Sequence, residues 1–164
     1  RSKLGLGYLP QESSIFRGMN VEENILSILE KTESSNEKKK KKLEGLLAEF
    51  GIEHIRYAPS LSLSGGERRR LEIARCLASN PNFILLDEPL AGIDPIAIQD
   101  VKKLIQNLKK KSIGVLITDH NVKSTLEIVD RAYIIFEGKV LFQGKPDEII
   151  KNKNVRTFYL GNDF

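Results

Sequence analysis

The hydrophobic and polar positions follow two patterns, short apolar runs that predict strands and longer apolar stripes that predict helices. The apolar runs are residues 4–9, 83–86 and 114–118, and we expect the last two to be buried on both faces. Between the first two runs an amphipathic helix is predicted to end at Gly51. Its apolar stripe has helical spacing and consists of Leu43, Leu46, Leu47 and Phe50. Strands that alternate with helices in this order predict an α/β fold with a mostly parallel sheet.

Capping residues mark where several helices begin. Asn20, followed by Glu23 three positions later, predicts a capping box at the start of one helix. Ser64 predicts the N-cap of a second helix, which Pro81 brings to an end. Asp94, which precedes a proline, predicts the start of a third helix.

The last third of the chain predicts smaller elements. Residues 121–129 continue as a helix, and residues 131–136 and 140–143 form a β-hairpin. Residues 146–151 read as a further helix, and residues 155–164 read as a packed tail.

Composition and charge exclude some classes of function. The chain has 164 residues with a formal net charge of +4, and it has no apolar run long enough for a transmembrane helix. Much of the positive charge lies in one lysine run, residues 38–42, and basic residues do not alternate with aromatic ones as in surfaces that stack bases. We therefore expect no nucleic-acid partner. The single cysteine, Cys76, cannot form an internal disulfide, which fits a reducing cytoplasm.

Polar residues with phosphate and metal chemistry follow the predicted strands. Asp87 comes directly after an apolar run, where a carboxylate can hold a magnesium ion. Glu88 comes next and can accept a proton from an attacking water. Gln11 follows the first strand and can share a metal's oxygen shell. His120 lies just past the third strand, where an imidazole can stabilise charge on a terminal phosphate.

A small-residue turn opens the helix that Ser64 caps. Gly65 and Gly66 allow close backbone approach, and a helix N-terminus presents unpaired N–H groups and a positive dipole end. Together they suit a phosphate group. Glu67 completes the turn.

These residues resemble, in order, five motifs of the ABC-transporter ATPases. The resemblance is to the Q-loop, signature, Walker B motif, D-loop and switch histidine of that family, carried by Gln11, Leu63-Ser64-Gly65-Gly66-Glu67, the apolar run into Asp87-Glu88, Ala91-Gly92-Ile93-Asp94 and His120. It implies a P-loop NTPase-like core with a small helical signature subdomain. We accordingly expect four parts: residues 1–11 as the end of an N-terminal core, 12–80 as the helical subdomain, 81–152 as the α/β catalytic core and 153–164 as a C-terminal tail.

The resemblance also implies a mechanism. Two subunits form a homodimer that encloses ATP and Mg²⁺, with Asp87 and Gln11 near the metal and Glu88 and His120 as the catalytic residues. Ser64, Gly65, Gly66 and Glu67 would contact the nucleotide bound by the partner subunit, and Asp94 would lie at the dimer seam. Glu67 stands where many members carry glutamine, so it adds a charge at that position.

One motif of the family has no counterpart here. The pattern Gly-x-x-x-x-Gly-Lys-Ser/Thr, the phosphate-binding Walker A loop, does not occur in the chain. We therefore interpret the chain as a fragment that lacks the N-terminal Walker A part, and expect it to bind ATP poorly and to be inactive by itself.

Within the family, residues 7–12, 14–17, 65–70 and 118–122 resemble the ATPases of lipopolysaccharide export. That resemblance implies a translocase subunit at the cytoplasmic face of the inner membrane. It would associate with the membrane only through LptF/LptG-like permease subunits, which Phe16 and Arg17 would contact. Three alternatives stay open: the ATPase of a branched-chain amino-acid importer, a soluble ABC ATPase that acts on ribosomes or DNA, and a non-catalytic regulator.

Overall fold

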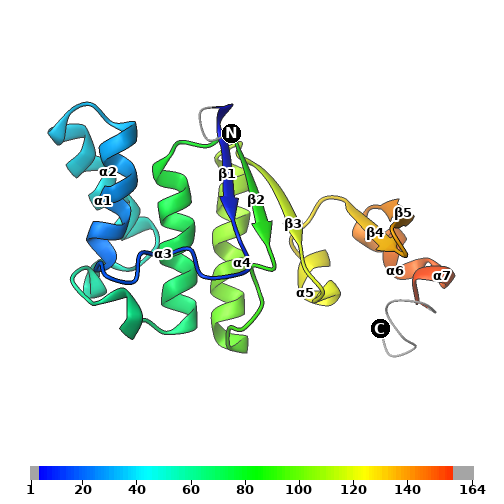
Figure 1. Cartoon of the computed structure of the whole chain (residues 1–164). Helices are drawn as coiled ribbons and strands as arrows, with labels where there is room; N and C mark the ends of the chain where they lie inside the picture. The colour runs from blue at the N-terminus through cyan, green and yellow to red at the C-terminus, as the bar shows by residue number, and fades with distance from the viewer. Residues whose placement is uncertain (1–3, 157–164) are drawn as a thin grey trace. The chain divides into compact units, whose positions relative to one another are not determined.

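The computed structural model describes residues 4–156, and the chain divides into two compact units, residues 1–119 and 120–164. Figure 1 shows the helices and strands of both units.

The first unit contains a parallel sheet of three strands in the order β1-β2-β3. The strands are β1 (Leu6–Leu9), β2 (Phe83–Asp87) and β3 (Gly114–Thr118), and the register places Asp87 beside Thr118. The predicted α/β class with a parallel sheet is confirmed. Strand β1 begins two residues later than predicted because Gly5 has a φ of 77°, a left-handed conformation that breaks the strand.

Four helices complete this unit: α1 (Val21–Thr32), α2 (Asn36–Glu49), α3 (Gly65–Ala78) and α4 (Pro95–Lys110). Two short 3₁₀ turns, Glu53–Ile55 and Ser60–Ser62, lie between α2 and α3. Helix α3 packs against α1 and α2 on one side and against β1 and α4 on the other (Figure 1). The core that joins these helices includes side chains with no more than 1 % of their surface exposed, among them Ile25, Leu29, Leu47, Leu71, Ile73 and Ile105.

The expectation that β2 and β3 are buried on both faces is wrong for the described residues. Ile84 and Leu86 are buried, but Phe83 is 40 % exposed and Leu116 is 49 % exposed. Successive side chains of a strand point to opposite faces, and along β2 buried residues alternate with residues that are exposed or half-buried, so one face is covered more fully than the other. An uninterrupted apolar run does not reveal which of its residues are covered.

The predicted helix starts are confirmed. Asn20 and Glu23 form a reciprocal capping box, and Asp94 accepts hydrogen bonds from two backbone N–H groups of the first turn of α4. The stripe on α2 is buried as expected, and Gly51, with a φ of 60°, follows its C-cap.

The second unit is built on a hairpin. Strands β4 (Ala132–Phe136) and β5 (Lys139–Gly144) are antiparallel, and Glu137 and Gly138 both have positive φ, as a tight two-residue hairpin turn requires. Helices α5 (Val122–Leu126), α6 (Pro146–Lys151) and α7 (Lys153–Val155) complete it, around a small core that includes Leu126, Ile134 and Ile149.

The hairpin and the helix at 146–151 are confirmed. Helix α5 is shorter than expected, since it ends at Leu126 and not at residue 129. Most of the predicted tail, residues 157–164, lies outside the described residues. No helix among residues 4–156 is long and apolar enough to cross a membrane.

Candidate functional site

Gln11 and Glu88 meet beyond the carboxyl ends of β1 and β2. The Gln11 Nε2 donates a hydrogen bond to Glu88 Oε2 over 2.8 Å, although the two residues are 77 positions apart. Parallel strands β1 and β2 are neighbours in register, so the segments that leave them start side by side. The sheet thereby joins an amide and a carboxylate at its carboxyl edge, where ligands bind in open α/β sheets.

Asp87, the last residue of β2, lies at the same edge. Its Oδ1 accepts a hydrogen bond from the Thr118 hydroxyl, and its Oδ2 lies 3.4 Å from the Tyr8 hydroxyl. Both partners come from neighbouring strands and hold the carboxylate from its two sides. Asp87 and Gln11 supply oxygen donors, which suit Mg²⁺, an ion that binds few protein carboxylates and completes its shell with water and phosphate oxygens. No group of three or more His, Cys, Asp or Glu residues among the described ones could hold a metal by itself.

Glu88 has an unusual backbone. Its φ is 45°, in the left-handed region that residues other than glycine seldom adopt. Its N–H donates to the Thr118 carbonyl over 2.8 Å, and its own carbonyl accepts from Arg69 Nη2 over 3.2 Å. A strained conformation persists where the surroundings determine it, and such residues cluster at functional sites. The turn directs the Glu88 side chain toward Gln11.

The signature residues form the N-terminus of α3. Ser64 is the N-cap: its Oγ accepts from the Glu67 N–H over 3.3 Å, and Glu67 Oε2 accepts in return from the Ser64 N–H over 2.9 Å and from its hydroxyl over 2.7 Å. Ser64 and Gly65 are exposed, whereas Gly66 is buried. Ser64 and Glu67 have the spacing of a capping box, a signal that the sequence analysis did not use, and the box gives the charge of Glu67 a structural role.

The pH dependence of this capping box can be tested. Hydrogen bonds from the Ser64 hydroxyl and N–H hold the pKa of Glu67 below its ordinary value of 4.5. A lowered pKa in the folded state stabilises the protein above the unfolded pKa, and that stabilisation is lost as pH falls through the folded pKa. In urea unfolding of the full-length protein, we expect Glu67→Gln to be less stable than wild type near pH 7 by up to about 1 kcal/mol. The difference should shrink as pH falls below 4.5 and vanish once pH is below the pKa of Glu67 in the folded protein; a difference that does not change with pH would contradict this assignment.

Gly66 lets α3 and α4 approach closely. A Cβ on Gly66 would lie 2.9 Å from the Cβ of Ala97 in α4. The N-terminus of α3 also lies against the D-loop segment, because a Cβ on Gly65 would lie 3.3 Å from the Gly92 carbonyl oxygen. Ser64 and Asp94, which caps α4, therefore lie in adjacent segments of the unit.

We expect Gly66→Ala to destabilise the full-length protein by about 1–3 kcal/mol through this clash, and Ala97→Gly to restore part of the loss. Gly45→Ala is the matched control, since Gly45 lies inside α2 with nothing within 4 Å of its added Cβ, and alanine there should stabilise by up to about 1 kcal/mol. Thermal unfolding compares wild type, Gly66→Ala, the double variant Gly66→Ala/Ala97→Gly and Gly45→Ala. Equal behaviour of Gly66→Ala and Gly45→Ala would contradict the close approach.

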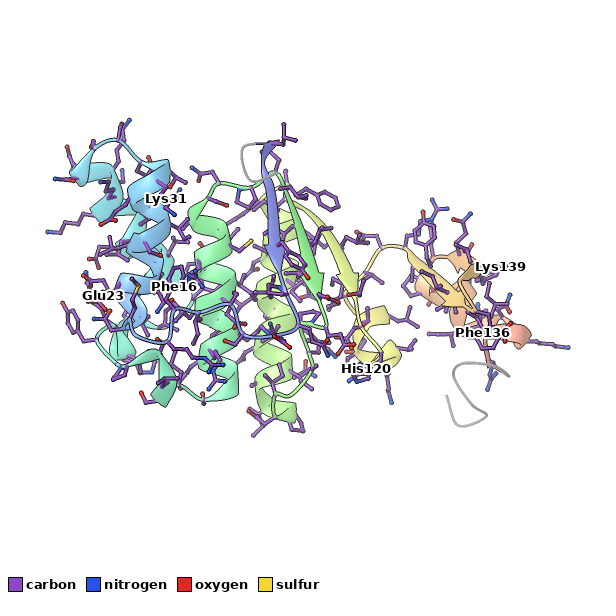
Figure 2. The ribbon with its side chains drawn as sticks, in the orientation of Figure 1. Phe16, Glu23, Lys31, His120, Phe136 and Lys139 are labelled. Carbon is purple, nitrogen blue, oxygen red and sulfur yellow. The ribbon has the colours of Figure 1, made fainter. Side chains whose placement is uncertain are left out.

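Phe16 and Arg17 are exposed residues of the segment between β1 and α1, in which Figure 2 labels Phe16. The guanidinium of Arg75, on α3, lies 4.5 Å from the centroid of the Phe16 ring. The Phe16 backbone N–H donates to the buried Asn24 side chain over 2.8 Å. Contacts with Arg75 and Asn24 thus hold the loop in place, while the Phe16 ring stays partly exposed.

His120 is the first residue of the second unit, so its position relative to Gln11, Asp87 and Glu88 is not assigned. Its carbonyl accepts from the Val122 N–H over 3.0 Å, at the start of α5 (Figure 2). The structure thus brings together Gln11, Asp87 and Glu88 at one edge of the sheet, and it places the signature residues on α3.

Sequence reasoning did not identify four residues that contact this edge, namely Tyr8, Thr118, Arg69 and Glu72. Strand register could have found the first two, because equal distances from the strand ends place Thr118 beside Asp87. No signal in the sequence separates Arg69 and Glu72 from an ordinary exposed pair at i, i+3 on a helix.

The chain matches known proteins over its whole length. The family model described as ABC transporter matches residues 1–91. A protein of Azorhizobium caulinodans named as a probable ABC transporter ATP-binding protein is 57 % identical over 164 residues, which are 100 % of this chain and 58 % of the relative. The lipopolysaccharide export system ATP-binding protein LptB of Escherichia coli K12 is 50 % identical, with 100 % of this chain and 68 % of the relative covered. The chain therefore spans roughly three fifths to two thirds of the length of these curated relatives.

Solved structures of ABC-transporter ATP-binding proteins have the same fold as this chain. The structure of cbiO1 from Clostridium perfringens, part of the ABC transporter complex cbiONQ, has a TM-score of 0.84 at 27 % identity and covers 94 % of this chain and 62 % of that one. MJ1267, an ATP-binding cassette of an ABC transporter, also has a TM-score of 0.84, at 26 % identity, with 98 % and 70 % covered. With a family model over more than half its length and a relative at 50 % identity, this chain belongs to the ABC transporter family, among its ATP-binding proteins.

Proposed function

We propose that the full-length protein hydrolyses ATP as the nucleotide-binding subunit of an ABC transporter. The hydrogen bond between Gln11 and Glu88, beside Asp87, carries this proposal. This hydrogen bond joins the Glu88 carboxylate, which can accept a proton from water, to the Gln11 amide, which can orient that carboxylate. Both residues follow strands whose carboxyl ends meet. Family membership supplies the reaction class.

The residues at the sheet edge and His120 have distinct roles in the proposed reaction. Asp87 and the Gln11 amide oxygen would hold Mg²⁺, which neutralises phosphate charge when bound. Glu88 would orient the attacking water and take its proton. His120 would contact the terminal phosphate, as a hydrogen-bond donor to its developing charge.

The remaining site residues act between subunits. In a homodimer, the N-terminus of α3 would present Ser64 and the backbone N–H groups of Gly65 and Gly66 to the ATP of the partner subunit. Glu67 would keep that N-terminus in shape through its capping box. Asp94, which lies in the segment next to Gly65, would line the dimer seam.

The transport substrate we propose is lipopolysaccharide, extracted from the inner membrane and exported to the outer membrane. The similarity to LptB supports this substrate. The protein would be cytoplasmic and would be held at the membrane by LptF/LptG-like permeases that contact Phe16 and Arg17. The branched-chain amino-acid importer ATPase remains the second candidate.

Purification from the native host tests both parts. We expect Mg²⁺-dependent ATP hydrolysis by the full-length protein, and co-purification of two permease subunits whose recovery falls when Phe16 is replaced by alanine. An amino-acid importer's permeases in the purified complex would establish the second candidate. Absence of any Mg²⁺-dependent hydrolysis would overturn the proposed function.

A further inference from the structure

Helix α3 carries a buried row of charged side chains that have no part in the proposed reaction. Arg69, Glu72 and Arg75 follow one another at intervals of three residues, and each is at most 9 % exposed. Charged groups are seldom buried without partners, because the loss of hydration must be offset by hydrogen bonds. Their partners here are groups of the Gln11 segment and of Glu88.

Arg69 connects both halves of the candidate site. Its Nη1 donates to Glu72 Oε2 over 3.0 Å and lies 3.4 Å from the Pro10 carbonyl oxygen, next to Gln11. Its Nη2 donates to the Glu88 carbonyl over 3.2 Å. One planar guanidinium therefore holds the residue that precedes Gln11 and the backbone of Glu88, where φ is positive.

Glu72 and Arg75 hold the segment on the other side of Gln11. Glu72 Oε1 accepts from the Ser13 hydroxyl over 2.7 Å and from the Ser14 N–H over 3.2 Å. Arg75 donates to the Ser14 carbonyl, and its guanidinium lies against the Phe16 ring. The contacts thus run without interruption along α3 from the Phe16 loop to Glu88.

We infer that Arg69 and Glu72 are positioning residues, which fix the Gln11 amide against the Glu88 carboxylate and tie both to the Phe16 loop. The inference rests on the proposed function. Because both sides of Gln11 are bound to one rigid helix, a shift of the Phe16 loop would reach Gln11 and Glu88 through these contacts. The same charges would otherwise be costly to bury.

Kinetics of the full-length protein test this role. We expect Arg69→Met to lower kcat by about tenfold or more with KM for ATP within about threefold, since a small misplacement of catalytic groups has a large effect on rate. Glu72→Gln, a milder change, should lower kcat in the same direction. The matched control is Arg56→Met, which removes ion pairs with Glu22 and Glu44 in the same unit and touches neither Gln11 nor Glu88. Its kcat should stay within about twofold of wild type.

A double mutant separates positioning from general loss of stability. If Arg69 acts through Glu88, Arg69→Met should cause no further loss in a Glu88→Gln background. Additive losses, or a kcat for Arg69→Met equal to that of wild type, would overturn the inference.

Hydrogen exchange of the amides in residues 11–16 gives a readout that does not depend on activity. Both Arg69→Met and Glu72→Gln should speed this exchange, and Arg56→Met should not. Unchanged exchange would overturn the inference even if the protein is active. If both variants exchange faster but the wild-type protein does not hydrolyse ATP, the proposed function is overturned and the structural link stays in place.

Discussion

Glu88→Gln in the full-length protein is expected to lower ATP hydrolysis by about 10²–10⁴-fold, the usual contribution of a general base. Glutamine keeps the length of the side chain and can still contact Gln11, but it cannot take a proton from water. ATP binding and ATP-driven dimerisation should persist, because the substitution leaves phosphate-binding groups in place. Steady-state hydrolysis and size-exclusion chromatography with ATP measure the two properties.

Gln11→Glu is a useful companion to that variant. It would place a second carboxylate 2.8 Å from Glu88 in place of the amide donor, so the contact would become repulsive. A Glu88→Gln protein that turns over ATP at the wild-type rate would remove Glu88 from the role of base, whatever the companion variant does.

Leu47→Ala is expected to destabilise the full-length protein by about 2–5 kcal/mol, which corresponds to a lower Tm by roughly 4–20 °C. Leu47 is fully buried on α2, among helices that support the signature helix α3. The control is Leu61→Ala, because Leu61 is 66 % exposed and its truncation should change stability by about 0.5 kcal/mol or less. Differential scanning calorimetry compares them. Equal Tm values for the two variants would show that the stripe on α2 is not a core.

Local rules explain what the sequence could predict. Asn20, Ser64 and Asp94 cap helices through side-chain oxygens that reach backbone N–H groups two or three positions away, so short stretches contain the whole signal. The turn at Glu137 and Gly138 is local in the same sense. The resemblance to the ABC-transporter ATPases also implied that Gln11, Asp87 and Glu88 act at one site.

The features that the sequence did not predict depend on contacts between distant segments. Arg69 and Glu72 look like a surface pair until α3 is packed against the segments that carry Pro10 and Glu88. The left-handed backbone of Glu88 likewise depends on its surroundings and not on its residue type. The exposed face of the sheet was missed because an apolar run such as residues 83–86 gives no sign of which face is covered.

A structure of the full-length Glu88→Gln protein with ATP and Mg²⁺ tests the central claim most directly. The account predicts Asp87 and Gln11 at the metal, residue 88 and His120 at the terminal phosphate, and Ser64 of each subunit at the nucleotide held by the other. ATP bound away from Gln11 and Asp87, or Ser64 directed at the nucleotide of its own subunit, would contradict it.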